Sequence, residues 1–192
     1  MKKIFWLDME MTGLDVTANR IIEVAVIVTD MNLQVVDKYE AVIKQPQEFL
    51  DQMDEWNTRT HGESGLTHRV RLGQPQFEVE MQLMALAEKH FGNDRIILAG
   101  SSISQDKLFI EKHMKKLATR LHFRIIDVSS MKAIFQWRYD VKFKRGKNHR
   151  ALMDVEESIE ELKLYLSFLD QSKMDHFIKN SGPNLENAFS DH

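Results

Sequence analysis

The stretch that decides the fold is KKIFWLDMEMTGLD, residues 2–15. Side chains two residues apart in a strand share a face, so residues 4–7 make this strand apolar on both sides. The alternation places Ile4, Trp6, Asp8 and Glu10 on one face and Phe5, Leu7, Met9 and Met11 on the other. A strand that is apolar on both faces is typical of the centre of a covered sheet. The stretch therefore predicts a central strand that ends in two acids.

The two acids, Asp8 and Glu10, are compatible with two interpretations. An Asp-x-Glu pair at a strand end is most often a solvated edge. Two carboxylates fixed side by side nevertheless repel each other unless a cation lies between them, and oxygen ligands suit Mg²⁺ or Mn²⁺. The metal interpretation needs further ligands elsewhere in the chain.

The composition limits the protein classes to consider. With 192 residues, 43% of them hydrophobic, and only 3 prolines, one globular domain with a sizeable core is expected. The absence of cysteine excludes disulfides, thiolate zinc sites and cysteine nucleophiles. The sequence has no secretory pattern and no apolar run near the roughly 20 residues that span a bilayer, so a cytoplasmic protein without a membrane partner is expected. The net charge of −3 argues against coating of long nucleic acids.

Three strands are expected first, followed by helices that alternate with short strands. The expected strands cover residues 3–10, 20–30, 35–44, 95–100 and 123–128. The expected helices lie around Trp56 and over residues 75–91, 101–117, 130–138 and 152–169. This order predicts an α/β fold in which helices flank a mixed sheet. Residues 1–170 would form the domain, and residues 171–192 a tail that is loose or docked on a partner subunit.

Side-chain patterns add detail to three of the expected helices. Phe77, Met81, Met84, Leu86 and Phe91 suggest the buried face of the helix that follows Pro75. Ser102 and Gln105 have the spacing of a capping box. Leu152, Val155, Ile159, Leu162, Leu166 and Leu169 form one apolar stripe.

Further candidate ligands lie at two helix starts. Asp106 follows the expected strand 95–100, and Asp154 lies in the first turn of the helix over residues 152–169. His149 precedes Asp154 by five residues in a basic stretch that contains glycine. Each acid alone would usually be a helix-start residue favoured by the helix dipole, and a lone histidine is usually a surface residue. The joint pattern indicates a metal site.

Three motifs, DMEMTGLD, GSSISQD and HRALMD, resemble those of the DEDDh exonuclease superfamily, whose fold is ribonuclease H-like. The stretches MDEWNTRTHGESGL and RIIDVSS resemble more narrowly the oligoribonuclease family, over nearly the whole chain to about Phe168. The resemblance implies that two divalent cations, Mg²⁺ or Mn²⁺, are held by Asp8, Glu10, Asp106 and Asp154, and that His149 is the general base.

The same resemblance implies a 3′-to-5′ exoribonuclease that hydrolyses short RNA, dinucleotides above all, to 5′-mononucleotides. The implied substrate contacts are Leu14, Trp56, His61 and Ser102 within one subunit, and Phe123, Arg124 and Ser129 from the partner subunit of a homodimer. Leu14 could instead be a turn residue tucked into the core, Trp56 a helix-packing residue and Ser102 a helix cap. Phe123 stands where the family usually has tyrosine, and Met153 where it has a second aspartate.

Two other functions stay open from the sequence. One is a DEDDh exonuclease that acts on longer RNA or DNA 3′ ends, which would need larger basic surfaces than a net charge of −3 suggests. The other is a nucleic-acid-binding module that has lost catalysis. Retention of all four acids and of His149 argues against the inactive module, because such a module needs none of them.

Overall fold

The computed structural model describes residues 2–144, 146 and 150–181 of the chain. His149 and residues 182–192 lie outside the described residues.

One five-stranded sheet forms the centre of the protein, in the order β3-β2-β1-β4-β5. The strands are β1 (Lys3–Met11), β2 (Ile21–Asp30), β3 (Val35–Val42), β4 (Ile96–Gly100) and β5 (Leu121–Asp127). The first three pair as an antiparallel meander, whereas β4 runs parallel to β1 and β5 parallel to β4. The predicted mixed sheet is confirmed, with β1 as its central strand.

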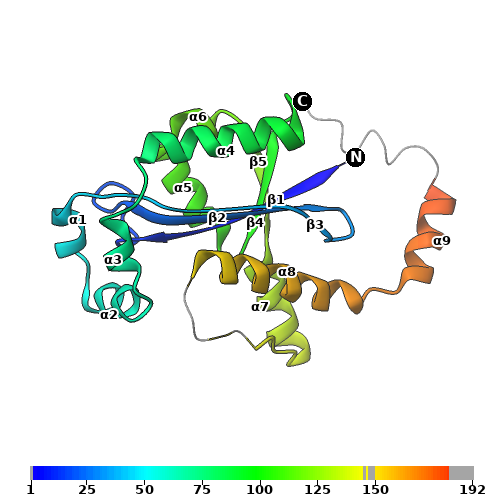
Figure 1. Ribbon diagram of the computed structural model, residues 1–192. Helices are drawn as coiled ribbons and strands as arrows, with labels where there is room; N and C mark the ends of the chain where they lie inside the picture. Colours follow the sequence, from blue (N-terminus) through cyan, green and yellow to red (C-terminus); the bar gives the residue numbers. More distant parts are fainter. Residues whose placement is uncertain (1, 145, 147–149, 182–192) are drawn as a thin grey trace.

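Helices cover both faces of the sheet (Figure 1). One face carries α4 (Gln76–Phe91), α5 (Ile103–His113) and α6 (Lys115–Ala118), and the other carries α7 (Val128–Tyr139) and α8 (Ala151–Ser167). Three helices gather at the end of the sheet toward which β1 runs: α1 (Gln47–Asp51), α2 (Glu55–Glu63) and α3 (Leu66–Val70). Helix α9 (Gln171–Ser181) lies at the opposite end, within the expected tail.

The alternation along β1 divides the core into two clusters, as predicted. Phe5, Leu7 and Met9 pack in the cluster that includes residues of α4 and α5, and Ile4 and Trp6 in the cluster that includes residues of α7 and α8. All five side chains are buried, and the Trp6 indole donates a hydrogen bond to Thr29 Oγ1 at 3.0 Å. Because both faces of β1 are covered, the acids at its end are fixed on a rigid strand.

The amphipathic helix predicted after Pro75 is confirmed as α4, which ends before Gly92, but its buried residues are not those whose spacing suggested it. The fully buried residues of this helix are Val79, Leu83 and Ala87, whereas the Phe77 side chain is 66% exposed. Residues four apart on a helix lie on one face, so Val79, Leu83 and Ala87 form a single line that packs in the core. Of the predicted face, Met84, Leu86 and Phe91 pack at the edge of the core, and Met81 is exposed.

The capping-box prediction at the start of α5 is also wrong. Ser102 adopts a left-handed conformation with a φ of 56°, and its side chain makes no capping bond. Its amide instead donates to Asp127 Oδ1 at 2.9 Å, and Gln105 Nε2 donates to the Leu14 carbonyl at 2.7 Å. Long-range contacts therefore replace the local pair.

The apolar stripe of α8 is confirmed over most of its length. Val155, Ile159 and Leu162 are buried against the sheet, whereas Leu166 and Leu169 are exposed. Within the described part of the chain, none of the helices has both the length and the apolar composition to cross a membrane.

Candidate metal centre

Three carboxylates from separate parts of the chain meet at the end of β1. One oxygen each from Asp8, Glu10 and Asp154 lies within 4.8 Å of the others. The strand period places Asp8 and Glu10 on the same face, and α8 packs on that face with Asp154 in its first turn. Three hard oxygen donors at this spacing fit a divalent cation.

The start of α8 orients Asp154. The backbone amide of Arg150, the residue before the helix, donates to Asp154 Oδ2 at 3.2 Å. This bond ties one oxygen of the carboxylate to the helix terminus, so the direction in which Asp154 faces depends on where α8 begins.

Asp106, the fourth predicted ligand, lies beside the cluster of three. Its side chain is buried, and Oδ1 accepts a hydrogen bond from the Met9 amide, between Asp8 and Glu10, at 3.0 Å. Burial raises the pKa of Asp106, and the charge of Asp106 in turn raises the pKa of Glu10. The structure thus brings Asp106 against the strand that carries the two acids, with one oxygen used by the backbone.

The surroundings of Glu10 disfavour the charged form of its carboxylate. Burial, followed by repulsion from Asp154, Glu23 and Asp106, raises the pKa of Glu10 to about 8 in the protein without metal. A divalent cation between the carboxylates would reverse this balance, because it favours the charged forms. The donor set therefore fits the ions that the sequence predicts.

Three of the predicted substrate contacts lie near the same end of β1. His61 is buried, its Nε2 donates to the Met11 carbonyl at 3.0 Å, and its Nδ1 is 4.0 Å from Glu10 Oε2. Leu14 and Trp56 are 74% and 51% exposed, which excludes core packing as the role of either side chain. Gln105 holds the turn that presents Leu14.

Ser102 and Ser129 are brought together by one carboxylate. Asp127 Oδ1 accepts from the Ser102 amide and from the amide and hydroxyl of Ser129, at 2.9, 2.9 and 2.6 Å. Asp127 lies at the end of β5, opposite Gly100 at the end of β4. Both serines therefore lie just beyond the carboxyl ends of the parallel strands β4 and β5.

The other two predicted contacts, Phe123 and Arg124, lie on the edge strand β5. Both are exposed, and the Arg124 guanidinium carbon is 5.2 Å from the centre of the Phe123 ring. They are not part of the carboxylate cluster.

Sequence reasoning missed four residues that make hydrogen bonds to the candidate site residues or to the start of α8, which are Glu23, Gln105, Asp127 and Arg150. One signal was present, because Glu23 interrupts the apolar run RIIEVAVIVTD and a charged residue inside a buried strand requires partners. The partners themselves come from distant segments and leave no local pattern.

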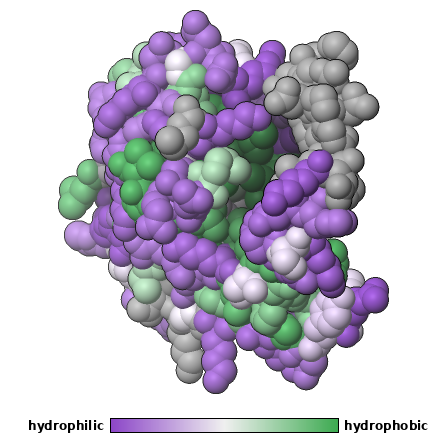
Figure 2. Space-filling view, turned by 90° about the vertical axis from the view of Figure 1, so that its right-hand side faces the viewer, coloured by the Kyte–Doolittle hydropathy of each residue, from purple (hydrophilic) through white to green (hydrophobic). Residues whose placement is uncertain are grey.

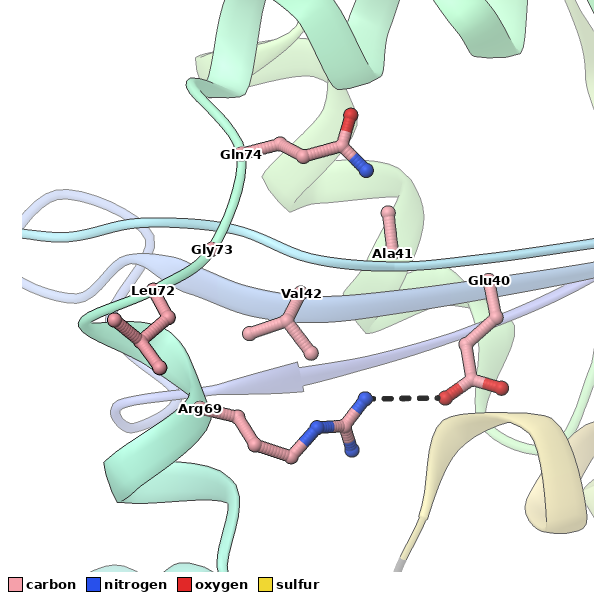
Figure 3. A pocket seen from close by; sticks show the side chains of 7 residues that line it. All are labelled: Glu40, Ala41, Val42, Arg69, Leu72, Gly73 and Gln74. Atoms are coloured by element: carbon pink, nitrogen blue, oxygen red, sulfur yellow. Dashed lines mark hydrogen bonds and ion pairs between the residues drawn. The ribbon is translucent and has the colours of Figure 1, made fainter.

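A shallow pocket lies at the edge of the sheet, lined by residues 40–42, Arg69 and residues 72–74. Figure 3 shows Arg69 reaching from α3 toward Glu40, with the start of α8 nearby. None of the clustered carboxylates lines it, so the acids rather than this hollow mark the candidate site.

Comparisons with known proteins agree with this geometry. A model of the exonuclease family matches residues 5–162. The oligoribonuclease of Pseudomonas aeruginosa strain PAO1 is 43% identical over 183 residues, which cover 93% of this chain and 97% of that protein. The oligoribonuclease of Marinobacter nauticus is 43% identical over 182 residues, with 92% and 97% covered.

Solved structures show the same fold. Exonuclease I from Methylocaldum szegediense matches with a TM-score of 0.68 and 16% identity, over 86% of this chain and 40% of that chain. Escherichia coli exonuclease I in complex with a dA16 oligonucleotide matches with a TM-score of 0.66 and 14% identity, over 100% and 46%. This chain thus spans less than half of those proteins, and the likeness supports the ribonuclease H-like fold.

Proposed function

Because the chain belongs to the exonuclease family and matches oligoribonucleases over nearly its whole length, we propose that it is a metal-dependent 3′-to-5′ exoribonuclease of short RNA. The products would be 5′-mononucleotides. The observation that carries the proposal is the cluster of Asp8, Glu10 and Asp154, with Asp106 beside it.

We propose that these four acids hold two ions, Mg²⁺ or Mn²⁺. Two ions on a phosphodiester activate a water and neutralise the charge that develops on the attacking and leaving oxygens. The contribution of the protein is to fix the carboxylates on a rigid strand and at two helix starts, so that little reorganisation is needed when RNA binds.

His149 is the proposed general base of this reaction. An imidazole with an ordinary pKa near 6.5 can accept a proton at neutral pH. The neighbouring residue in the chain, Arg150, is anchored at the start of α8, close to Asp154. The support for His149 is its place in the motif HRALMD, five residues before Asp154 in the chain.

The substrate would be gripped by its bases and by its phosphates. The exposed side chains of Leu14 and Trp56 offer apolar surface, and an aromatic ring can stack on any base. The buried His61, next to Glu10, would contact the terminal nucleotide, and Ser102 a phosphate. An RNA of two nucleotides would be preferred if the 5′ phosphate were also capped from outside the subunit.

We propose that a homodimer supplies this cap, with Phe123, Arg124 and Ser129 of one subunit serving the site of the other. Phe123 is exposed on the edge strand, and Trp137 on α7 is 84% exposed. Figure 2 shows hydrophobic residues gathered in the centre and lower part of the face that it presents, within a largely hydrophilic surface. An arginine is suited to the cap, because its guanidinium can bind two phosphate oxygens. The expected cytoplasmic location is part of this proposal.

The function is tested with 5′-labelled RNAs of two to twenty nucleotides, incubated with Mg²⁺, Mn²⁺ or EDTA. We expect stepwise shortening from the 3′ end with either ion and none in EDTA. Asp154→Ala should abolish shortening, whereas Glu160→Ala, an exposed acid on the same helix, should retain it. Digestion in EDTA or by Asp154→Ala would contradict the proposal.

The substrate length and the dimer need separate readouts. We expect Arg124→Ala to lose the preference for dinucleotides and Lys112→Ala, an exposed cation elsewhere, to keep it. Sedimentation should show a dimer at the assay concentration. Equal rates on all lengths would refute the phosphate cap, and faster cleavage of long RNA or DNA would favour an exonuclease with longer substrates.

A further inference from the structure

Glu23 is a fully buried carboxylate near the start of β2, one of the inner strands of the sheet. It lies on β2 directly opposite Glu10 in the β1–β2 ladder, and its side chain is 0% exposed. A buried charge is costly unless it is paired and hydrogen-bonded. The residues that pair with Glu23 therefore indicate its role in the structure.

Both carboxylate oxygens of Glu23 have partners. Oε1 accepts from Arg69 Nη1 and lies 3.1 Å from Arg150 Nη2, and Oε2 accepts from Arg150 Nε at 3.3 Å. Oε2 also accepts from the backbone amide of Ala151 at 3.2 Å. Three of these four contacts reach the residues at which α8 begins.

Glu23 takes the place of a capping residue for α8. The residue before the helix, Arg150, makes no side-chain capping bond, and the first amides of a helix need acceptors from elsewhere. The Ala151 amide is the first of the helix, and an anion at a helix start is also favoured by the helix dipole. A strand residue more than a hundred positions earlier thus fixes where α8 starts.

Asp154 contacts Arg150 as well, because its Oδ2 accepts a hydrogen bond from the Arg150 amide. Arg150 therefore donates to Glu23 through its side chain and to Asp154 through its amide. Glu10, the neighbour of Glu23 across the strands, lies in the same cluster as Asp154. Glu23 thus links β2, which pairs with β1, to the start of α8. The distance between β1 and α8 sets the spacing of Asp8, Glu10 and Asp154.

A second carboxylate, Glu40, binds the same two arginines from the sheet edge. Its Oε1 lies 3.4 Å from Arg69 Nη2 (Figure 3). The same oxygen lies 2.9 Å from Arg150 Nη2. Glu40 is exposed and, among the contacts of the described residues, has no bond to the backbone of α8. Glu40 shares both arginines with Glu23 but lies at the surface, so it is a control for the loss of these ion pairs without the contact to α8.

We propose that Glu23 is a positioning residue for the metal centre, which holds the first turn of α8 so that Asp154 stays within ligand distance of Asp8 and Glu10. This role rests on the proposed function, since it assigns the cluster to divalent cations. Buried ion pairs contribute little to net stability compared with apolar packing, so a role in stability alone does not explain why a charge lies here.

The test measures binding of Mn²⁺ by calorimetry without RNA, together with the Mn²⁺ concentration that gives half-maximal hydrolysis and the Tm. Residues behind metal ligands typically change metal affinity or activity by about 10- to 100-fold. We expect Glu23→Ala to weaken Mn²⁺ binding about tenfold or more, with hydrolysis recovering at high Mn²⁺. Glu23→Gln keeps an oxygen for the Ala151 amide and should weaken binding about threefold. Glu40→Gln should bind Mn²⁺ like the unchanged protein.

A lower Tm with unchanged Mn²⁺ affinity in Glu23→Ala would overturn the proposal, because it would show a structural role only. If Glu23→Ala does not fold, Glu23→Gln decides, and unchanged affinity in that variant would overturn the proposal as well. Equal weakening of Mn²⁺ binding by Glu40→Gln would also overturn the proposal, since the contact between Glu23 and the first turn of α8 would then not explain the effect. If the unchanged protein bound Mn²⁺ but cut no RNA, the proposed function would fail while the calorimetry still tested Glu23.

Discussion

Glu10 and Glu23 face each other across β1 and β2, yet their carboxylates have opposite surroundings. Glu23 is matched by two arginines, whereas the surroundings of Glu10 include Asp154, Asp106 and Glu23, which raise its pKa. Burial is the largest cause of the raised pKa of Glu10, followed by the repulsion from these three acids. The protein thus pairs Glu23 with its own arginines, whereas the charged form of Glu10 would be stabilised by a cation.

Metal binding should release protons at neutral pH. The pKa of Glu10 is about 8 in the folded protein without metal, against an ordinary value of 4.5, and a bound cation requires the carboxylate. Calorimetry of Mg²⁺ binding in buffers with different ionisation enthalpies should detect this release near pH 6 and a decline above pH 8. Glu10→Gln should release fewer protons at pH 6. Release independent of pH would contradict the assignment.

The metal-free protein should lose stability as the pH rises. Between the unfolded pKa of 4.5 and the folded pKa of about 8, the folded state holds the Glu10 proton more tightly. The contribution of Glu10 to the free energy of unfolding is complete below pH 4.5 and is lost as the pH rises through 8. Urea unfolding in EDTA at several pH values should show this trend, and Glu10→Gln should flatten it.

Gly100→Ala should destabilise the sheet near the site. A Cβ at this position would lie 2.6 Å from the Leu7 carbonyl oxygen, which belongs to the central strand and cannot move cheaply. We expect a loss of about 1–3 kcal/mol in the free energy of unfolding, as for other overpacked positions. Gly62→Ala is the control, because its Cβ would meet no atom within 4 Å. Equal denaturation midpoints for the two variants would refute this close approach.

Leu83→Ala should cost about 2–5 kcal/mol in the free energy of unfolding, because it leaves a cavity in the core between α4 and the sheet. Phe77→Ala on the same helix should change it by less than about 0.5 kcal/mol, since that ring is exposed. A larger loss for Phe77→Ala than for Leu83→Ala in chemical denaturation would show that Phe77, and not Leu83, lies on the buried face of α4.

Gln105→Ala should weaken substrate binding through the turn that presents Leu14. The lost bond to the Leu14 carbonyl has a net value of about 0.5–1.5 kcal/mol, so we expect KM to rise about 2- to 10-fold with little change in kcat. Gln47→Ala, which loses only a bond to Asp51, is the control. A fall in kcat at unchanged KM would assign Gln105 to the chemistry instead.

The sequence predicted those features that depend on local periodicity. The alternation along β1 was enough to separate Phe5 from Trp6 into two clusters and to place Asp8 beside Glu10. Apolar residues that recur along α8 likewise predicted the face that packs on the sheet. In both cases, one repeating pattern determines which side chains are buried.

Features that depend on distant contacts were not predictable in the same way. Ser102 and Gln105 have the spacing of a capping box, but Asp127 and the Leu14 carbonyl compete for their hydrogen bonds. The helix α4 contains apolar residues on two faces, and only the shape of the core selects Leu83 over Phe77. The position of Glu23 behind the site requires knowledge of where α8 begins.

The bond between Glu23 and the Ala151 amide also bears on when the nuclease becomes active during synthesis. It joins residues 128 positions apart, and Asp154 follows it in the chain. A ribosome releases the strands first and α8 much later, and domains tend to fold as units. A nascent chain that has acquired β1 to β5 therefore holds three of the four acids but lacks the helix that completes the metal centre. Translation must pass residue 154 before the protein can attack RNA.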